Sequence, residues 1–162
     1  MSKKLVYLMA AAAMFVLILG LGAAFSNSDT DESNNAEIRW YSYEDGVNQI
    51  KKSDKKGYLH FYTDWCGYCK KMEAETFSDD DVADSLNQDF VAIKINAENK
   101  PDIAKQYGAE QFPFSHFTDG QNEPIGNQPG FIPPDVMVHL LKYLATDNYK
   151  KMRFDEFMDN RQ

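Results

Sequence analysis

The chain has 162 residues and a formal net charge of −8, from 17 Lys and Arg against 25 Asp and Glu. Aromatic residues make up 14% of the chain, which suits a packed globular domain and argues against intrinsic disorder. The acidic balance argues against a nucleic-acid partner, because binding a phosphate backbone needs clustered Lys and Arg.

Residues 1–26 form a hydrophobic leader. Lys3 and Lys4 precede an uncharged apolar run over residues 5–25, a pattern typical of an export signal that is removed. The same run is long enough, at about 1.5 Å per residue, to cross a bilayer core and remain as a membrane anchor. Both alternatives stay open, and both place the rest of the chain outside the cytoplasm, with the two lysines on the cytoplasmic side.

Residues 27–37 predict a polar linker, and residues 38–162 predict one domain of alternating strands and helices. In chain order the hydrophobic pattern predicts a strand at 38–43, a helix at 44–52, a strand at 58–62, a helix at 70–77, a helix from Ser78, a strand at 90–95, a short helix from Pro101 to Gly108, a strand at 114–117, a hairpin turn at Asp119-Gly120, a long helix at 135–144 and a tail helix at 153–158.

Two of the predicted helices carry more specific expectations. The helix from Ser78 is expected to be capped by Ser78 or Asp79 and to turn three apolar side chains inward, those of Val82, Ala83 and Leu86. The tail helix is expected to pack on the edge of the sheet. The order of elements, a parallel half followed by an antiparallel hairpin, predicts an α/β fold with a mixed central sheet flanked by helices.

Only two cysteines are present, Cys66 and Cys69, and they lie between a predicted strand and a predicted helix. A zinc site needs about four ligands, usually supplied in pairs, and the three histidines are scattered along the chain: His60, His116 and His139. Covalent haem attachment would need a histidine directly after the second cysteine, where Lys70 stands. A purely structural bridge would close a very short loop and remove little chain entropy.

Redox exchange is the chemistry that remains for this pair. At the start of a helix, the positive end of the helix dipole and the free N–H groups favour a thiolate, which is the species that attacks a disulfide. Cys66 is therefore predicted to attack, and Cys69, one helical turn later, to resolve the mixed disulfide. This chemistry needs neither a metal nor a cofactor.

The segment "FYTDWCGYCKKMEAETF", residues 61–77, resembles the active-site segment of the thioredoxin superfamily. It is most similar to exported thioredoxin-like proteins with the pattern W-C-x-x-C-K-x-[ML]-E. Residues 90–131 follow the later pattern of that family: strand, helix, x-Pro, strand, D-G turn, strand and glycine. The resemblance covers roughly residues 40–144 and implies a thioredoxin fold.

The resemblance also assigns roles around the cysteines. Trp65 would shield the pair and offer a platform for partners, with ordinary packing as the alternative. Pro113 stands where the family has its cis-proline, and its preceding peptide, from Phe112, would bind an extended substrate strand through main-chain hydrogen bonds. The dipeptide Gly67-Tyr68 resembles that of periplasmic disulfide isomerases.

Two departures from the family pattern concern the surroundings of the cysteines. His60 stands where typical thioredoxins carry a buried aspartate, and it either performs proton transfer near neutral pH or is a neutral core residue. Lys94 falls at the position of a family lysine and would lack its usual partner if His60 is neutral. Around the proline, Phe112 and Phe114 are bulkier than is usual in the family.

These patterns predict a thiol–disulfide oxidoreductase outside the cytoplasm, in the periplasm or an equivalent compartment. We expect it to reduce disulfides of exported proteins and to be recharged by a membrane electron donor. The acidic residues around the motif disfavour the very low Cys66 pKa typical of strong oxidants: Asp64, Glu73 and Glu75. The alternatives are a disulfide oxidase or isomerase, and a non-catalytic binding module on the same scaffold.

Overall fold

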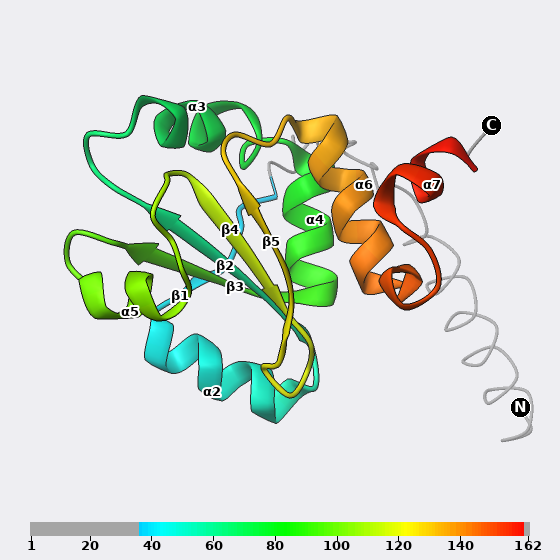
Figure 1. The fold of residues 1–162 in the computed structure, drawn as a ribbon, viewed down its shortest axis with the longest axis horizontal. Coiled ribbons are helices and arrows are strands. Elements are labelled where there is room, and N and C mark those ends of the chain that lie inside the picture. The colour runs from blue at the N-terminus through cyan, green and yellow to red at the C-terminus, as the bar shows by residue number, and fades with distance from the viewer. Residues whose placement is uncertain (1–35, 161–162) are drawn as a thin grey trace, which may run out of the picture. The chain divides into compact units, whose positions relative to one another are not determined.

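The computed structural model describes residues 36–160 of the chain (Figure 1). The leader predicted over residues 1–26, with its signal or anchor, and most of the linker predicted over 27–37 lie outside the described residues. Within residues 36–160 no helix has the length and apolar character needed to cross a bilayer.

A five-stranded mixed sheet runs through the centre of the domain in the order β1-β3-β2-β4-β5. Its strands are β1 (Trp40–Tyr41), β2 (Lys56–Tyr62), β3 (Phe90–Asn96), β4 (Phe114–Thr118) and β5 (Pro124–Pro129). The first three in the sheet order are parallel, whereas β4 is antiparallel to β2 and β5 is antiparallel to β4. The predicted combination of a parallel half with an antiparallel hairpin is confirmed.

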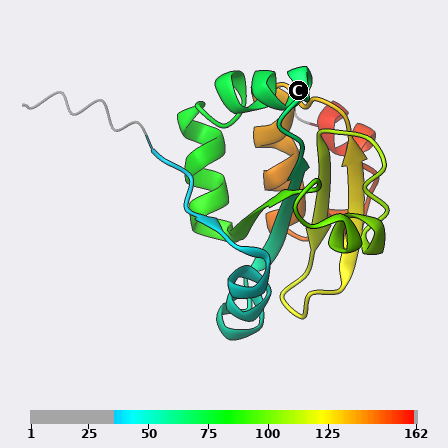
Figure 2. The same ribbon diagram turned by 90° about the vertical axis from the view of Figure 1, so that its left-hand side faces the viewer.

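Helices cover both faces of this sheet (Figures 1 and 2). One face carries α2 (Tyr43–Ser53) and α5 (Pro101–Gln106), and the other carries α3 (Gly67–Glu75), α4 (Asp80–Asp89) and α6 (Pro134–Ala145). A short 3-10 helix η1 (Asn148–Lys150) and α7 (Phe154–Asp159) follow. The layered arrangement gives two hydrophobic cores, one on each face.

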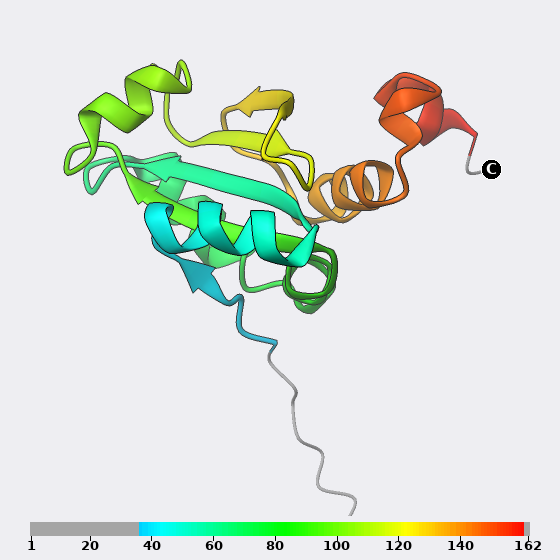
Figure 3. The ribbon, with the colours of Figure 1, turned by 90° about the horizontal axis from the view of Figure 1, so that it is seen from below.

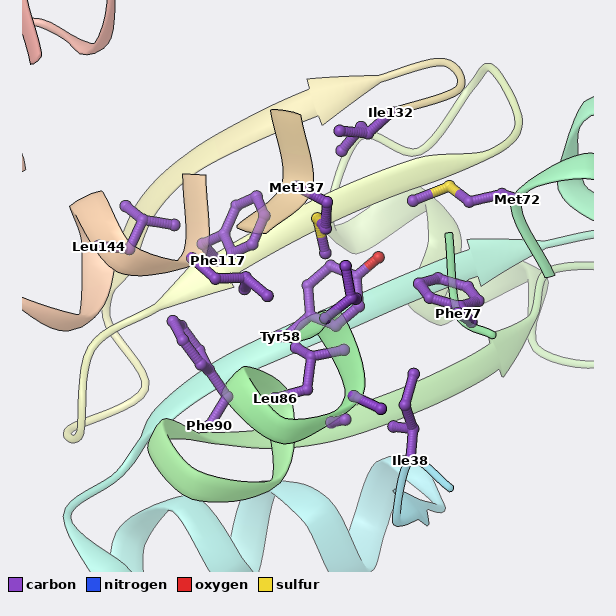
Figure 4. Close-up of a cluster of buried hydrophobic side chains, with 14 of the residues drawn as sticks. Ile38, Tyr58, Met72, Phe77, Leu86, Phe90, Phe117, Ile132, Met137 and Leu144 are labelled. Atoms are coloured by element: carbon purple, nitrogen blue, oxygen red, sulfur yellow. The ribbon is translucent and has the colours of Figure 1, made fainter. Parts of the chain in front are cut away.

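The central strand β2 contributes side chains to both cores, and five of its seven residues are buried. Tyr58 packs into the core under α4 and α6, where it meets Leu86, Phe117 and Met137 (Figure 4). Leu59 and Phe61 belong to the core on the other face. Because each fully buried Leu, Phe or Met side chain contributes about 1.5–3 kcal/mol, these cores fix β2 firmly, together with the segment that follows it.

The N-terminal segment, residues 36–39, is bound to α4. The backbone N–H of Ala36 donates to Asp80 Oδ1 at 3.2 Å, and that of Arg39 donates to Asn87 Oδ1 at 2.9 Å. The Asn87 side chain in turn donates to the carbonyl of Glu37 at 3.0 Å. These bonds replace strand pairing before Trp40, and α2 already begins at Tyr43 with Ser42 as its cap, so the strand predicted at 38–43 is shortened to the two residues of β1.

The tail helix does not pack on the edge of the sheet as predicted; α7 packs on α6 instead. The ring centroids of Phe154 and Phe157 lie 5.4 and 5.3 Å from that of Tyr143 on α6. The Tyr143 hydroxyl also donates to the carbonyl of Met152 at 2.6 Å. Figure 3 shows α7 beyond α6, away from the sheet, because its aromatic side chains find their partner on that helix.

Candidate active site

The cysteine motif forms the junction between β2 and α3. The sequence predicts a helix over 70–77, but α3 begins at Gly67, directly after Cys66. Cys66 is the N-cap residue, with an extended backbone, and its Sγ accepts the backbone N–H of Cys69 at 3.0 Å. The sulfur thus takes the place of the oxygen that usually caps a helix start, and the first cysteine lies at the positive end of the helix.

The two cysteines are joined in a disulfide, with their Cα atoms 5.3 Å apart. Each retains only 4% of its surface exposed. The exposed large hydrophobic side chains among residues 36–160 are those of Trp65 and Tyr68, at 70% and 66% exposure, and each directly precedes one of the two cysteines in the chain. A protein that reaches this disulfide therefore meets two aromatic side chains first.

The segment 112–113 lies beside the motif. In the antiparallel pairing of β2 and β4, Phe114 is the register partner of Phe61, so Pro113 lies next to the end of β2 where the motif begins. The Phe112–Pro113 peptide is cis, and Pro113 is buried. The Phe112 ring packs edge-to-face against that of Trp65, with the centroids 6.4 Å apart. Fold and packing thus place Trp65, Phe112 and Pro113 at the end of β2 from which the cysteine motif begins.

A loop after the second hairpin strand holds this segment in place. The backbone N–H of Gly130 donates to the carbonyl of Pro113 at 2.7 Å, and Gly130 has a φ of 89°, which favours glycine. Two residues later, the carbonyl of Ile132 accepts the hydroxyl of Thr76 at 2.6 Å. The end of α3 and the proline segment are therefore fixed to the same loop.

Lys94 lacks its usual partner at position 60, as expected for a neutral His60, but it has another partner on α3. Its Nζ donates to both carboxylate oxygens of Glu73, at 2.6 and 2.7 Å. The ammonium also lies 5.2 Å from the centroid of the Tyr62 ring and 5.7 Å from that of Trp40. Glu73 was not among the site residues predicted from the sequence, although its place four residues after Cys69 puts both side chains on one face of α3.

Glu73 and Cys69 share a pocket of about 420 Å³, which we call the Cys69 pocket. It is lined by Tyr62, Thr63, Asp64, Cys69, Lys70, Glu73, Ala74 and Lys94. The second cysteine, although almost fully buried, thus borders a pocket that contains ionisable side chains. Within residues 36–160 no group of three or more His, Cys, Asp or Glu side chains is arranged to hold a metal ion.

His60 is fully buried in an aromatic environment. Its ring lies 4.9 Å from that of Phe77, 6.0 Å from that of Tyr62 and 6.2 Å from that of Trp40, measured between centroids. Neither ring nitrogen has a hydrogen-bond partner among residues 36–160. Burial, and secondly the charge of Lys94, lower the pKa of His60 to about 3. This environment favours the interpretation of His60 as a neutral core residue.

The other two histidines lie away from the disulfide. His116 is buried on β4, where its Nδ1 is hydrogen-bonded to Asn127 Oδ1 and its ring packs 4.8 Å from that of Tyr107. Burial lowers the pKa of His116, and the hydrogen bond to Asn127 partly opposes this. His139 lies on α6. Neither residue lines the Cys69 pocket.

Comparison with known proteins identifies the family of the chain. Residues 43–145 match a family model described as "Thioredoxin-like domain". An uncharacterised protein of Caenorhabditis elegans is 32% identical over 110 residues, which cover 62% of this chain and 15% of that protein. The thiol:disulfide interchange protein DsbD of Vibrio vulnificus is 32% identical over 109 residues, which cover 63% of this chain and 18% of that protein. The chain thus spans less than a fifth of the length of either relative.

A solved structure shows the same fold. A thioredoxin from Thermus thermophilus superimposes with a TM-score of 0.63 at 22% identity, covering 68% of this chain and 89% of that one. At this level of identity the likeness concerns the fold alone. The mixed sheet with helices on both faces, predicted from the sequence, is a thioredoxin fold.

Proposed function

The chain belongs to the thioredoxin-like family, and from this premise we propose that it is a thiol–disulfide oxidoreductase acting by dithiol exchange at Cys66 and Cys69. The observation that carries the proposal is the disulfide at the first turn of α3, with one of its sulfur atoms capping the helix. A disulfide at this position closes too short a loop to matter greatly for stability, but it is well placed for exchange.

The proposed reaction transfers two electrons from the reduced protein to a target disulfide. The Cys66 thiolate attacks one target sulfur, a mixed disulfide forms, and the other target sulfur leaves as a thiolate that takes up a proton. Cys69 then loses its proton and attacks Cys66 Sγ, so that the second target thiol is released. The protein ends with the Cys66–Cys69 disulfide, and both target sulfurs end as thiols.

We assign the attack to Cys66 because of its position at the N-terminus of α3. The dipole of the helix and the N–H of Cys69, which points at its sulfur, both stabilise negative charge there. Cys69 lies within the first turn and borders the Cys69 pocket. In the reduced protein its thiol must lose a proton before it can resolve the mixed disulfide.

Glu73 is the group that we propose as acceptor of the Cys69 proton. It lines the same pocket as Cys69, and its carboxylate is held in place by the paired hydrogen bonds from Lys94. A positioned carboxylate is a suitable general base for a proton transfer of this kind. His60 is less suitable, because its ring is sealed among aromatic side chains and stays neutral at physiological pH.

For the physiological direction, we propose reduction of disulfides in exported proteins, with recharging by a membrane electron donor. The apolar leader after Lys3 and Lys4 supports a site of action outside the cytoplasm. Similarity to the thiol:disulfide interchange protein DsbD supports disulfide exchange as the activity. Anchoring through residues 5–25 is the alternative to removal of the leader.

The decisive measurement is the reduction potential in a glutathione buffer. A value near that of thioredoxin, about −270 mV, supports a reductase, and a value near −120 mV means an oxidant instead. An intermediate value of about −180 mV would favour an isomerase. A Cys66→Ser/Cys69→Ser double variant is the matched control and is expected to reduce no disulfide. Failure of the unmodified protein to exchange with any disulfide would support the binding-module alternative.

A further inference from the structure

Thr63 carries a buried hydroxyl group without a hydrogen-bond partner. The residue is 3% exposed, and its Oγ1 bonds to no other group among residues 36–160. The buried hydroxyl of Thr76, by contrast, donates to the carbonyl of Ile132 at 2.6 Å. Because an unpaired buried hydroxyl destabilises a folded protein, its presence at Thr63 calls for a physical explanation.

The position of Thr63 connects this hydroxyl with the cysteine pair. Thr63 joins the end of β2 to the cysteine motif, and its carbonyl accepts the backbone N–H of Cys66 at 3.3 Å. It also lines the Cys69 pocket, together with Cys69 itself. The fold therefore holds an unpaired hydroxyl beside the second cysteine.

The disulfide offers no proton to this hydroxyl, whereas the reduced pair does. Neither sulfur of a disulfide carries a hydrogen, and Cys66 Sγ already accepts the N–H of Cys69. Reduction by two molecules of glutathione breaks the S–S bond and adds two electrons and two protons, while the glutathione becomes its own disulfide. The two sulfur atoms then separate to non-bonded distance, and the Cys69 thiol can both donate and accept a hydrogen bond.

We propose that the Thr63 hydroxyl forms a hydrogen bond with the Cys69 sulfur only in the reduced protein, and so favours the dithiol over the disulfide. The inference rests on the proposed function, because it requires that the Cys66–Cys69 pair is reducible in the folded protein. In the oxidised form the hydroxyl stays unpaired, which penalises that form alone. Thr63 thereby raises the reduction potential and makes the protein a weaker reductant than the same fold without the hydroxyl.

The first test compares the stability of the two redox forms of Thr63→Val, which removes the hydroxyl and keeps the shape of the side chain. In the oxidised form an unpaired group is lost, so the equilibrium constant for unfolding is expected to fall. In the form reduced with a phosphine a hydrogen bond is lost, so this constant is expected to rise. The two changes should differ by about fivefold, the net effect of one hydrogen bond. Urea unfolding of both forms gives the measurement without any need for exchange activity.

The second test is the equilibrium with glutathione. Thr63→Val is expected to shift it about fivefold toward the disulfide, which corresponds to a reduction potential about 20 mV more negative. Thr63→Ser keeps the hydroxyl but loses the methyl group, and it should retain the equilibrium of the unmodified protein. A shift in the serine variant equal to that in the valine variant would mean that packing, and not the hydroxyl, is the cause, and would overturn the proposal.

Thr118→Val is the matched control. Thr118 is 1% exposed, and its Oγ1 also has no partner in the described part of the chain. It pairs with Gly57 at the start of β2, six residues and therefore about 20 Å along the strand from Thr63. This variant is expected to change the stability of both redox forms equally and to leave the glutathione equilibrium unchanged.

The two measurements separate this proposal from the proposed function. If Thr63→Val acts oppositely on the two redox forms but glutathione does not exchange with the pair, the proposed function fails and the role of Thr63 stands. If exchange proceeds and Thr63→Val changes both forms alike, as Thr118→Val does, the role of Thr63 is overturned and the proposed function stands. A pair that neither the phosphine nor glutathione reduces in the folded protein would overturn both.

Discussion

Lys94 and Glu73 meet between β3 and α3, with the lysine Nζ 2.6 and 2.7 Å from the two carboxylate oxygens. In the sheet, Lys94 is the register partner of His60, yet its charge is balanced by the helix rather than by the neighbouring strand. A neutral residue at position 60 is therefore compatible with a charged lysine beside it. The acid beside Lys94 is therefore Glu73 on α3, whereas the family pattern has an aspartate at position 60 on the strand.

This arrangement predicts the effect of Glu73→Gln. The variant keeps the size of the side chain but removes the proposed base, so kcat for disulfide reduction is expected to fall at least about tenfold near neutral pH. The loss should shrink at higher pH, where the Cys69 thiol ionises without help. Steady-state rates across pH give the measurement. Glu75→Gln removes the same charge from α3 without touching the Cys69 pocket, and an equal loss in both variants would contradict the assignment.

The positions of the two cysteines predict that the two single-cysteine variants trap different amounts of mixed disulfide. Cys69→Ser leaves the attacking thiol without a resolving one, so it is expected to accumulate mixed disulfides with partner proteins. Cys66→Ser retains only the thiol inside the helix and should trap few. Gels run without reductant after alkylation separate the adducts. Equal trapping by both variants would show that the attacking role is shared.

Burial of His60 predicts a loss of stability in acid. The pKa is lowered from 6.5 to about 3 in the folded protein, so the unfolded chain binds more protons between these values. The stability that the neutral, buried His60 ring contributes is fully present above about pH 6.5. As the pH falls to about 4.5, the free energy of unfolding is expected to drop by about 2–3 kcal/mol because of this residue. Between about pH 6.5 and about pH 4.5 the His60→Phe variant should lose less stability than the unmodified protein. Urea unfolding of both proteins at these two pH values gives the measurement. Equal losses would mean that the buried ring does not resist protonation.

The same variant separates the two roles considered for His60. If the ring is only a core residue, His60→Phe should leave the pH dependence of disulfide reduction unchanged between about pH 6 and 8, because a group with a pKa of about 3 does not titrate there. A changed profile would favour proton transfer by His60. His60→Asp restores the acid of typical thioredoxins and is expected to change that profile, since it places a second carboxylate beside Lys94.

The conformation of Gly130 predicts the cost of adding a side chain. Gly130→Ala places a Cβ in open space but forces a φ of 89° on an L-residue, for about 1–2 kcal/mol of lost stability. Gly126→Ala also adds a Cβ in open space, without a positive φ, and should cost little. Urea unfolding of the two variants compares them directly. A similar loss in both would show that the backbone at Gly130 is not the cause.

Local sequence patterns predicted those elements that depend on neighbouring residues. Asp79 caps α4 by accepting the N–H of Val82, as expected, and Val82, Ala83 and Leu86 are fully buried. A capping side chain and an apolar face at helical spacing both lie within one short segment. The mixed sheet followed from the order of such segments.

Other features depend on contacts between distant segments, which local patterns do not contain. Helix propensity placed the start of α3 three residues late, because Gly67 and Tyr68 are weak helix formers, whereas the redox argument had put Cys66 correctly at the helix start. The ion pair of Glu73 with Lys94 joins residues 21 apart in the chain, so it required the packing of α3 against the sheet. The tail helix was assigned to the wrong surface for the same reason.

The attachment of residues 36–39 to α4 has a mechanical consequence. A force that pulls on the chain at Ala36 acts first on the hydrogen bonds to Asp80 and Asn87, and then on the two-residue pairing of β1 with β3. The cysteine motif follows β2, which is separated from β1 by β3. Tension at this end of the domain would therefore be borne by the outer strand and α4, while the redox helix keeps its geometry.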